Sequence, residues 1–112
     1  MATGWTRQTF LDWCRVAEDG PFSSISCGER ITFRNTEMIT SVAAAAALTT
    51  RPRVMVNLAV TPWHETALLA KQMATIDVIS DGRLDLGVGV GARGQDFEAM
   101  HAPMDHRHQR VD

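Results

Sequence analysis

Apolar positions recur along the chain at two spacings, one typical of helices and one typical of extended strands. Helical spacing marks three stretches, residues 6–19, 36–49 and 65–79. The middle stretch contains five consecutive alanines, the residue with the highest helix propensity, and Thr36 is placed to cap its start. The pattern therefore predicts three helices.

Extended stretches separate these helices. Residues 22–27 are short and mostly small, residues 54–60 are almost continuously apolar, and residues 83–91 alternate leucine, valine and glycine. An uninterrupted apolar run is typical of a parallel strand that is buried on both faces. Residues 95–100 indicate the start of a further helix or turn, and the last dozen residues are polar and unassigned. The predicted order is α-β-α-β-α-β, which implies a parallel sheet with right-handed helical crossovers.

Size and charge narrow the possible functions. The chain has 112 residues, enough for one modest core, with 45% apolar and 21% charged residues. A net charge of −2 without a basic run gives no reason to expect nucleic acid as a partner. No apolar stretch is long enough for a membrane span, and the first residues lack a signal core. Cys14 and Cys27 lack metal-ligand spacing, and two buried thiols are favoured over a disulfide, so we expect a cytoplasmic protein.

Three segments together resemble the luciferase-like monooxygenase family. They are Ser26–Arg30 (SCGER), Val54–Pro62 with the helix that follows, and Leu68–Gly91, which reads LLAKQMATIDVISDGRLDLGVGVG. The third is long and keeps helix and strand in one register. The resemblance covers nearly the whole chain. It implies a TIM-type (β/α)8 barrel that binds FMN or the deazaflavin coenzyme F-420 and acts by redox chemistry on a small organic substrate.

The resemblance also places the cofactor. Chemistry in such barrels lies at the carboxyl ends of the strands. The family sets its flavin or deazaflavin ring against the second and third of these strand ends, which implies cofactor contacts from Asn57, Leu58 and Ala59 and from residues 89–91. The family often has a non-proline cis peptide in this second strand, which by position would be Leu58–Ala59. The three residues of the other segment are Gly89, Val90 and Gly91.

Alternate glycines end the third predicted strand, and their presence needs a reason. Glycine weakens a strand, so Gly87, Gly89 and Gly91 are not there for strand propensity. They allow a flat ring or another backbone to approach closely.

Glu29 and Arg30 are the charged candidates at the first strand end, and we assign them to catalysis or substrate contact. Deazaflavin-dependent dehydrogenases of the family often have histidine at the position of Arg30, which weighs against a mechanism with histidine as the base here. An equally weighted alternative is that Glu29 and Arg30 form a solvated or mutually paired loop.

A full barrel needs about 250 residues, so this chain is expected to be one incomplete barrel domain over residues 1–112. The opening strand and the C-terminal half would be missing, because Met1–Trp5 is too short for a strand. We expect an isolated fragment that is poorly folded and inactive. The alternative is a non-catalytic half-barrel that forms a homo-oligomer through its open sheet edges.

Two other patterns suggest rival functions. Residues 89–94 match the G-x-G-x-x-G dinucleotide fingerprint. This fingerprint should open a helix and be followed about 20 residues later by an acidic residue. We expect no helix to start directly at Gly94, and the acidic residue at that distance is the terminal Asp112. A Rossmann-type module is therefore less favoured. A group of metal-type side chains lies near the C-terminus, and we interpret it as a solvated segment at the start of a helix rather than as a metal site. The His64–Glu65 pair is likewise interpreted as a helix start, although His64 is also a candidate for substrate contact. That metal-like group consists of His101, Asp105, His106 and His108.

Overall fold

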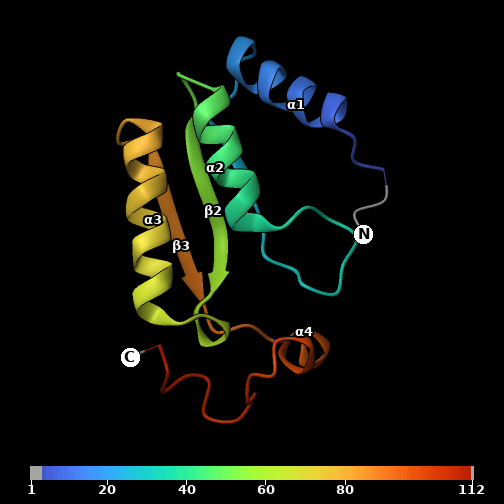
Figure 1. Cartoon of the computed structure of the whole chain (residues 1–112), viewed down its shortest axis with the longest axis vertical. Helices are drawn as coiled ribbons and strands as arrows, with labels where there is room; N and C mark the ends of the chain where they lie inside the picture. The colour runs from blue at the N-terminus through green and yellow to red at the C-terminus, as the bar shows by residue number, and fades with distance from the viewer. Residues whose placement is uncertain (1–3, 112) are drawn as a thin grey trace.

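The computed structural model describes residues 4–111 and confirms the predicted alternation of helices and strands (Figure 1). Each crossover from one strand to the next passes through a single helix. The elements in chain order are α1 (Arg7–Asp19), β1 (Ser24–Cys27), α2 (Met38–Leu48), β2 (Arg53–Val60), the 3-10 turn η1 (Thr61–Trp63), α3 (Thr66–Ser80), β3 (Leu84–Gly89) and α4 (Gly94–Ala99).

The three strands form one parallel sheet in the order β1-β2-β3. The β2–β3 register shifts between Val56 and Ala59. A non-proline cis peptide lies within this shift and joins Asn57 to Leu58. The predicted position, Leu58–Ala59, is therefore wrong by one bond, because the irregularity begins directly after the last regularly paired residue, Val56.

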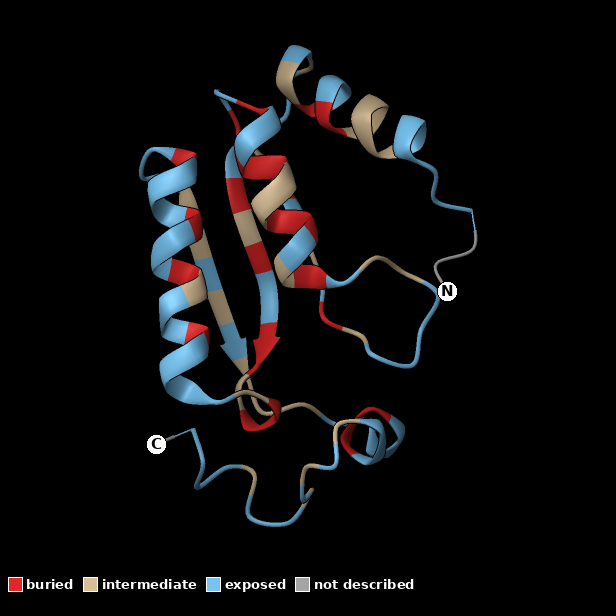
Figure 2. Cartoon of the chain, in the orientation of Figure 1, coloured by how far each residue is buried: buried red, intermediate tan, exposed pale blue. Residues whose placement is uncertain are grey.

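Helices α2 and α3 cover one face of the sheet, and the core lies between these layers (Figures 1 and 2). Val54 and Val56 of β2 have no exposed surface. Ala45 and Ala46 of α2 pack into the same cluster, so the alanine run provides the close helix–sheet approach. Burial of these side chains against β2 supplies the main apolar stabilisation of the fold.

Apolar surface remains exposed beyond this core. Leu86 and Val88 of β3 share the helix-covered side with Val56 and Ala59, yet they are 47% and 50% exposed. The opposite face of the sheet carries Leu58, which is 39% exposed. A three-stranded parallel sheet with helical crossovers and these open surfaces is a partial TIM-type barrel.

Three predicted boundaries are corrected. Glu37, and not Thr36, caps α2, because its carboxylate accepts hydrogen bonds from the N–H groups of Ile39 and Thr40 at 2.9 and 2.7 Å. The strand predicted over 83–91 ends at Gly89, because Gly91 adopts φ +70° and redirects the chain. Helix α4 does begin promptly at Gly94. Among the described residues, no helix is both long and apolar enough to span a membrane.

Two arginines close the opposite end of the sheet, where the strands begin. The Arg51 guanidinium donates to carbonyls at the end of α1 and just beyond it, those of Ala17, Glu18, Gly20 and Phe22. Arg83 does the same for the end of α2. Cations suit helix carboxyl ends because unpaired carbonyls and the helix dipole are both negative there.

Candidate functional site

Glu29 lies two residues beyond the end of β1, and its side chain is only 3% exposed. One carboxylate oxygen, Oε2, accepts a hydrogen bond from the Val60 N–H at 2.5 Å. The other, Oε1, lies 2.7 Å from Nε2 of His64. Both oxygens are therefore engaged inside the protein, and the carboxylate joins the end of β1 to the end of β2.

His64 lies between two carboxylates. The hydrogen bond to Glu29, with the charges of Glu29 and Glu37, raises the pKa of His64 above its ordinary value, although burial acts in the opposite direction. Burial would raise the pKa of the Glu37 carboxyl, but hydrogen bonds from Thr40 and Ile39 and the charge of His64 lower it. The contact with Glu29 therefore favours the protonated form of the His64 imidazole.

Arg30 connects the loop after β1 to α4, which follows β3. Its Nε donates to Oδ2 of Asp96 at 3.0 Å, and its guanidinium lies 5.1 Å from the centre of the Phe33 ring. The N–H and hydroxyl of Thr32 both donate to Oδ1 of Asp96, at 2.7 and 2.6 Å. Burial would raise the pKa of Asp96, but the Thr32 bonds and the Arg30 charge lower it. The Arg30 side chain keeps 31% of its surface exposed.

Two of the three alternate glycines, Gly87 and Gly89, lie under Leu58. A Cβ atom on Gly89 would come within 2.7 Å of the Leu58 Cδ1, and one on Gly87 within 3.5 Å of the Leu58 Cβ. The bare backbone of β3 thus leaves room for the Leu58 side chain. Ala59, in contrast, has no exposed surface. An external ring approaching this strand end would meet Leu58 first.

Contacts from η1 and the C-terminal turns complete this end of the sheet. The Thr61 hydroxyl is 3.4 Å from the Gly89 carbonyl, and Nε of Arg107 donates to the Gly91 carbonyl at 3.1 Å. Trp63 and Phe97 pack edge to face with ring centres 5.3 Å apart. A Cβ on Gly91 would collide with Val60 and Phe97, so only glycine fits there.

The structure therefore divides the predicted site residues into two groups at one end of the sheet. Glu29 and Arg30 belong to polar networks, while Gly89 lies against Leu58 and Gly91 lies against Val60 and Phe97. Sequence reasoning missed Asp96 altogether and did not connect His64 with Glu29. A sequence signal existed for His64, since it lies in the loop after the second strand, as Glu29 lies in the loop after the first.

Two observations bear on the rival patterns. Helix α4 begins at Gly94, as the dinucleotide fingerprint requires, which removes one of the two arguments against that fingerprint. Within residues 4–111, no group of three or more metal-type side chains is placed to hold an ion. His101 and His106 both have positive φ and lie in turns rather than at the start of a helix. Asp112, the acid required by the dinucleotide fingerprint, lies outside the described residues.

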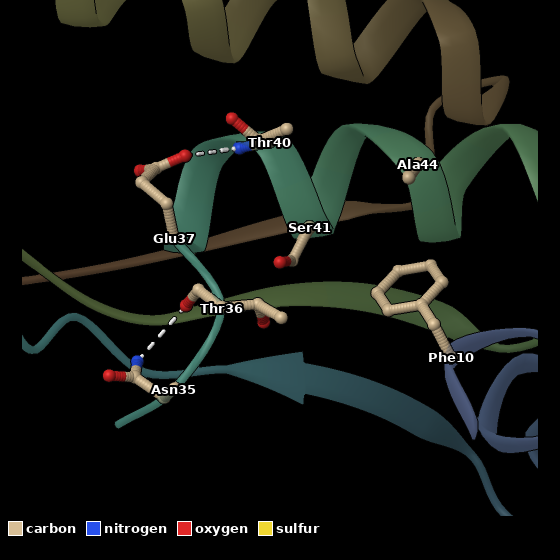
Figure 3. Close-up of a pocket in the computed structure, with 7 residues that line it drawn as sticks. All are labelled: Phe10, Asn35, Thr36, Glu37, Thr40, Ser41 and Ala44. Carbon is tan, nitrogen blue, oxygen red and sulfur yellow. Dashed lines mark hydrogen bonds between the residues drawn. The ribbon is translucent and has the colours of Figure 1, made fainter. Parts of the chain in front are cut away.

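A separate cavity lies at the start of α2 (Figure 3). It has a volume of about 540 Å3 and lies between Phe10 of α1 and the first turns of α2. The polar side chains shown around it include Asn35, Thr36 and Ser41. None of the predicted site residues lines this cavity.

The fold agrees with the family comparison. The luciferase-like monooxygenase family model matches residues 2–112, and the chain belongs to this family. The predicted family is therefore confirmed.

One related sequence and two related structures show the extent of the similarity. The oxygenase component of the flavin-dependent trigonelline monooxygenase of Acinetobacter baylyi is 31% identical over 98 residues, which is 85% of this chain and 27% of that protein. The FMN complex of the oxygenating constituent of 3,6-diketocamphane monooxygenase from Pseudomonas putida aligns with TM-score 0.81 and 22% identity, over 99% of this chain and 34% of that one. The coenzyme F-420-dependent tetrahydromethanopterin reductase of Methanopyrus kandleri aligns with TM-score 0.73 and 23% identity, over 88% and 28%. The chain thus spans about a quarter to a third of the length of these relatives.

Proposed function

We propose that this chain is the part of a luciferase-like oxidoreductase that carries one wall of the cofactor site, and that the complete site oxidises or reduces a small organic substrate. The observation that supports this most is the exposed Leu58 side chain lying on the bare backbone of Gly87 and Gly89. It forms an apolar shelf at the carboxyl end of a parallel strand, the end at which barrels of this type place their chemistry.

The residues present fit a planar redox cofactor, FMN or the deazaflavin F-420. Leu58 would contact the ring face, and the backbone of Gly89, Val90 and Gly91 would border it without side-chain obstruction beyond Val90. Asn57, which is exposed, would supply an amide at the ring edge. Reduced FMN would supply electrons for monooxygenation, and the reduced deazaflavin would supply a hydride.

Glu29 and Arg30 take different parts in this proposal. Glu29 has both carboxylate oxygens engaged, so it holds the ends of β1 and β2 together and keeps the His64 proton in place. Arg30 uses only Nε toward Asp96, and no described residue accepts a hydrogen bond from its two terminal nitrogens. Of these two residues, Arg30 is the one free to contact substrate.

We further propose that the isolated 112-residue chain does not catalyse turnover. The shelf is open to solvent, and the exposed Leu86 and Val88 favour self-association through β3. A non-catalytic homo-oligomer is the alternative, and the same exposed surface on β3 is the observation that favours it.

The test is a fluorescence titration of the purified chain with FMN and with coenzyme F-420, alongside size-exclusion chromatography. We expect weak saturable binding of one cofactor, no turnover, and a loss of affinity of about tenfold in Leu58→Gln. Val88→Gln is the matched control, because Val88 is similarly exposed but lies on the other face of the sheet. Equal effects of both substitutions, or no binding of either cofactor, would refute the shelf. Turnover by the isolated chain would refute its inactivity, and a discrete oligomer without binding would support the alternative.

A further inference from the structure

Arg30 is held in one orientation by groups that all belong to this chain. Its Nε donates to Oδ2 of Asp96, a side chain with no exposed surface. Asp96 is itself fixed, because its Oδ1 accepts hydrogen bonds from both the N–H and the hydroxyl of Thr32. The Phe33 ring lies against the guanidinium, with 5.1 Å between the guanidinium carbon and the ring centre. An arginine anchored in this way is pre-organised, so it loses little freedom when it binds a ligand.

This anchoring leaves the outer end of the guanidinium unused. In the part of the chain that the structure describes, neither terminal nitrogen of Arg30 has a hydrogen-bond partner, and the side chain remains 31% exposed. The two nitrogens present parallel N–H groups at that end, and their spacing matches the two oxygens of a carboxylate. A single neutral oxygen would engage one of these groups well, whereas a carboxylate would engage both. The unused end of Arg30 therefore favours a planar anion.

Arg30 borders a cavity whose lining indicates the rest of the ligand. The cavity has a volume of about 190 Å3 and lies against the loop after β1, with Ile31 and Met38 among its apolar lining. Ile31 is 37% exposed, and Phe33 beside the guanidinium is 62% exposed. Apolar surface next to a single charged group matches a ligand with an apolar body and one acidic end. The volume suits a small organic acid rather than a whole cofactor.

Two carboxylates also line this cavity, and each has partners of its own. Glu29 accepts from the Val60 N–H and lies 2.7 Å from Nε2 of His64. Glu37 accepts from N–H groups in the first turn of α2, where the helix dipole is positive. Because the oxygens of both carboxylates are engaged, they offer no acceptor to a ligand. The cation in the lining is Arg30, so an acidic ligand would be oriented toward it.

We infer that the substrate of the proposed redox site carries a carboxylate on an apolar body, and that the unused end of the Arg30 guanidinium binds this carboxylate through both terminal nitrogens. The apolar body would lie along Ile31, and Asp96 is a positioning residue that holds Nε. The inference rests on the proposed redox function, because it names the substrate class of that site. Since arginine does not lose its proton in proteins, Arg30 anchors the substrate and does not act as a base.

The test uses the purified 112-residue chain without cofactor and a matched pair of probes. Benzoate and benzamide have nearly the same size and shape, but only benzoate is charged. NMR of the arginine Nε–H groups reports on Arg30 directly, and the backbone amide of Ile31 reports on the cavity. We expect benzoate to shift both signals saturably and benzamide to bind about tenfold more weakly. Inorganic phosphate should also bind more weakly than benzoate, because it has no apolar body.

Three variants, followed through the Ile31 amide, separate the contact from general charge. Arg30→Gln should remove the preference for benzoate over benzamide, and Arg30→Lys should keep only part of it, because an ammonium does not present two parallel donors. Asp96→Asn sets an amide N–H against Nε and should weaken benzoate binding severalfold without changing benzamide binding. The matched control is Arg15→Gln, which removes the same charge from an exposed position on α1 and should leave both affinities unchanged.

Equal affinities for benzoate and benzamide, equal effects of Arg30→Gln and Arg15→Gln, or phosphate binding as tight as benzoate binding would each overturn the inference. If Arg30→Gln does not fold, the comparison of probes on the unchanged chain decides the question. A chain that binds a cofactor through Leu58 but does not bind benzoate would refute the substrate class alone. Benzoate binding without cofactor binding would refute the proposed function instead.

Discussion

Arg83 offers the sharpest test of how this fold is stabilised. Its guanidinium donates to the carbonyls of Ser80, Pro52, Ala46 and Thr49 at 2.6, 2.6, 3.0 and 2.7 Å, and to the Thr49 hydroxyl at 3.2 Å. These acceptors belong to the ends of α2 and α3 and to the start of β2. One side chain therefore joins three elements at the end of the sheet opposite the candidate site.

The magnitude follows from these bonds. A hydrogen bond to a charged group contributes about 1.5–3 kcal/mol, but the five are not additive, because half-buried carbonyls regain water when the arginine is removed. We expect Arg83→Met, which keeps the apolar stem, to lower the free energy of unfolding by about 3 kcal/mol. Arg83→Lys should recover less than half of this, since an ammonium cannot reach all five acceptors.

The assay is urea unfolding followed by circular dichroism on the species isolated by size exclusion. With a slope of about 1.5 kcal/mol per molar urea, the midpoint of Arg83→Met should fall by about 2 M at unchanged slope. The control is Arg53→Met, which removes an Arg53–Asp85 ion pair at 2.6 Å whose side chains are 48% and 38% exposed. It should lower the midpoint much less than Arg83→Met does, because solvent screens the pair. Equal losses for Arg83 and Arg53 would refute the reasoning.

Three further predictions follow from the same structure. Burial, with the nearby Cys14 thiol, raises the pKa of Cys27 to about 11, so iodoacetamide at pH 8 should alkylate native Cys27 far more slowly than the urea-unfolded chain; equal rates would contradict this. Because the pKa of His64 is raised by Glu29, the pair's stabilisation is full below the unfolded pKa and is lost as the pH rises through the folded pKa; an NMR titration should show the His64 pKa falling in Glu29→Gln. In urea unfolding, Gly91→Ala should lower the free energy of unfolding by about 1–3 kcal/mol more than Gly82→Ala does. Both glycines have positive φ, but of the two only Gly91 has another atom near the position of an added Cβ, at 2.5 Å.

The order of helices and strands could be predicted because each rests on local spacing of apolar residues. The ends of the elements could not, because they depend on individual side chains and backbone angles. The Glu37 carboxylate competes successfully with Thr36 as the cap of α2, and the positive φ of Gly91 ends the extended segment two residues early. Neither choice is determined by periodicity alone.

The candidate site was predictable only in part, for the same physical reason. Glu29 and the glycines are identifiable because they stand at strand ends, where parallel strands converge. Their partners are not, because Glu29 meets His64 across 35 positions and Arg30 meets Asp96 across 66. Asp96 also stands in the first turn of a short helix, where an acidic residue ordinarily needs no explanation beyond the helix dipole.

The two ends of the sheet use charge for different purposes. Where the strands begin, Arg51 and Arg83 donate to helix carbonyls, and no carboxylate of the described residues is buried there. Where the strands end, the buried carboxylate of Glu29 accepts a hydrogen bond from the last residue of β2, and that of Asp96 accepts hydrogen bonds from Thr32. Both interactions hold the loop after β1 in place beside the other strand ends. Substitutions at the first end should therefore change the free energy of unfolding without changing ligand affinity. Substitutions at the second should change both, because a loop that loses its carboxylate no longer holds the shelf in position.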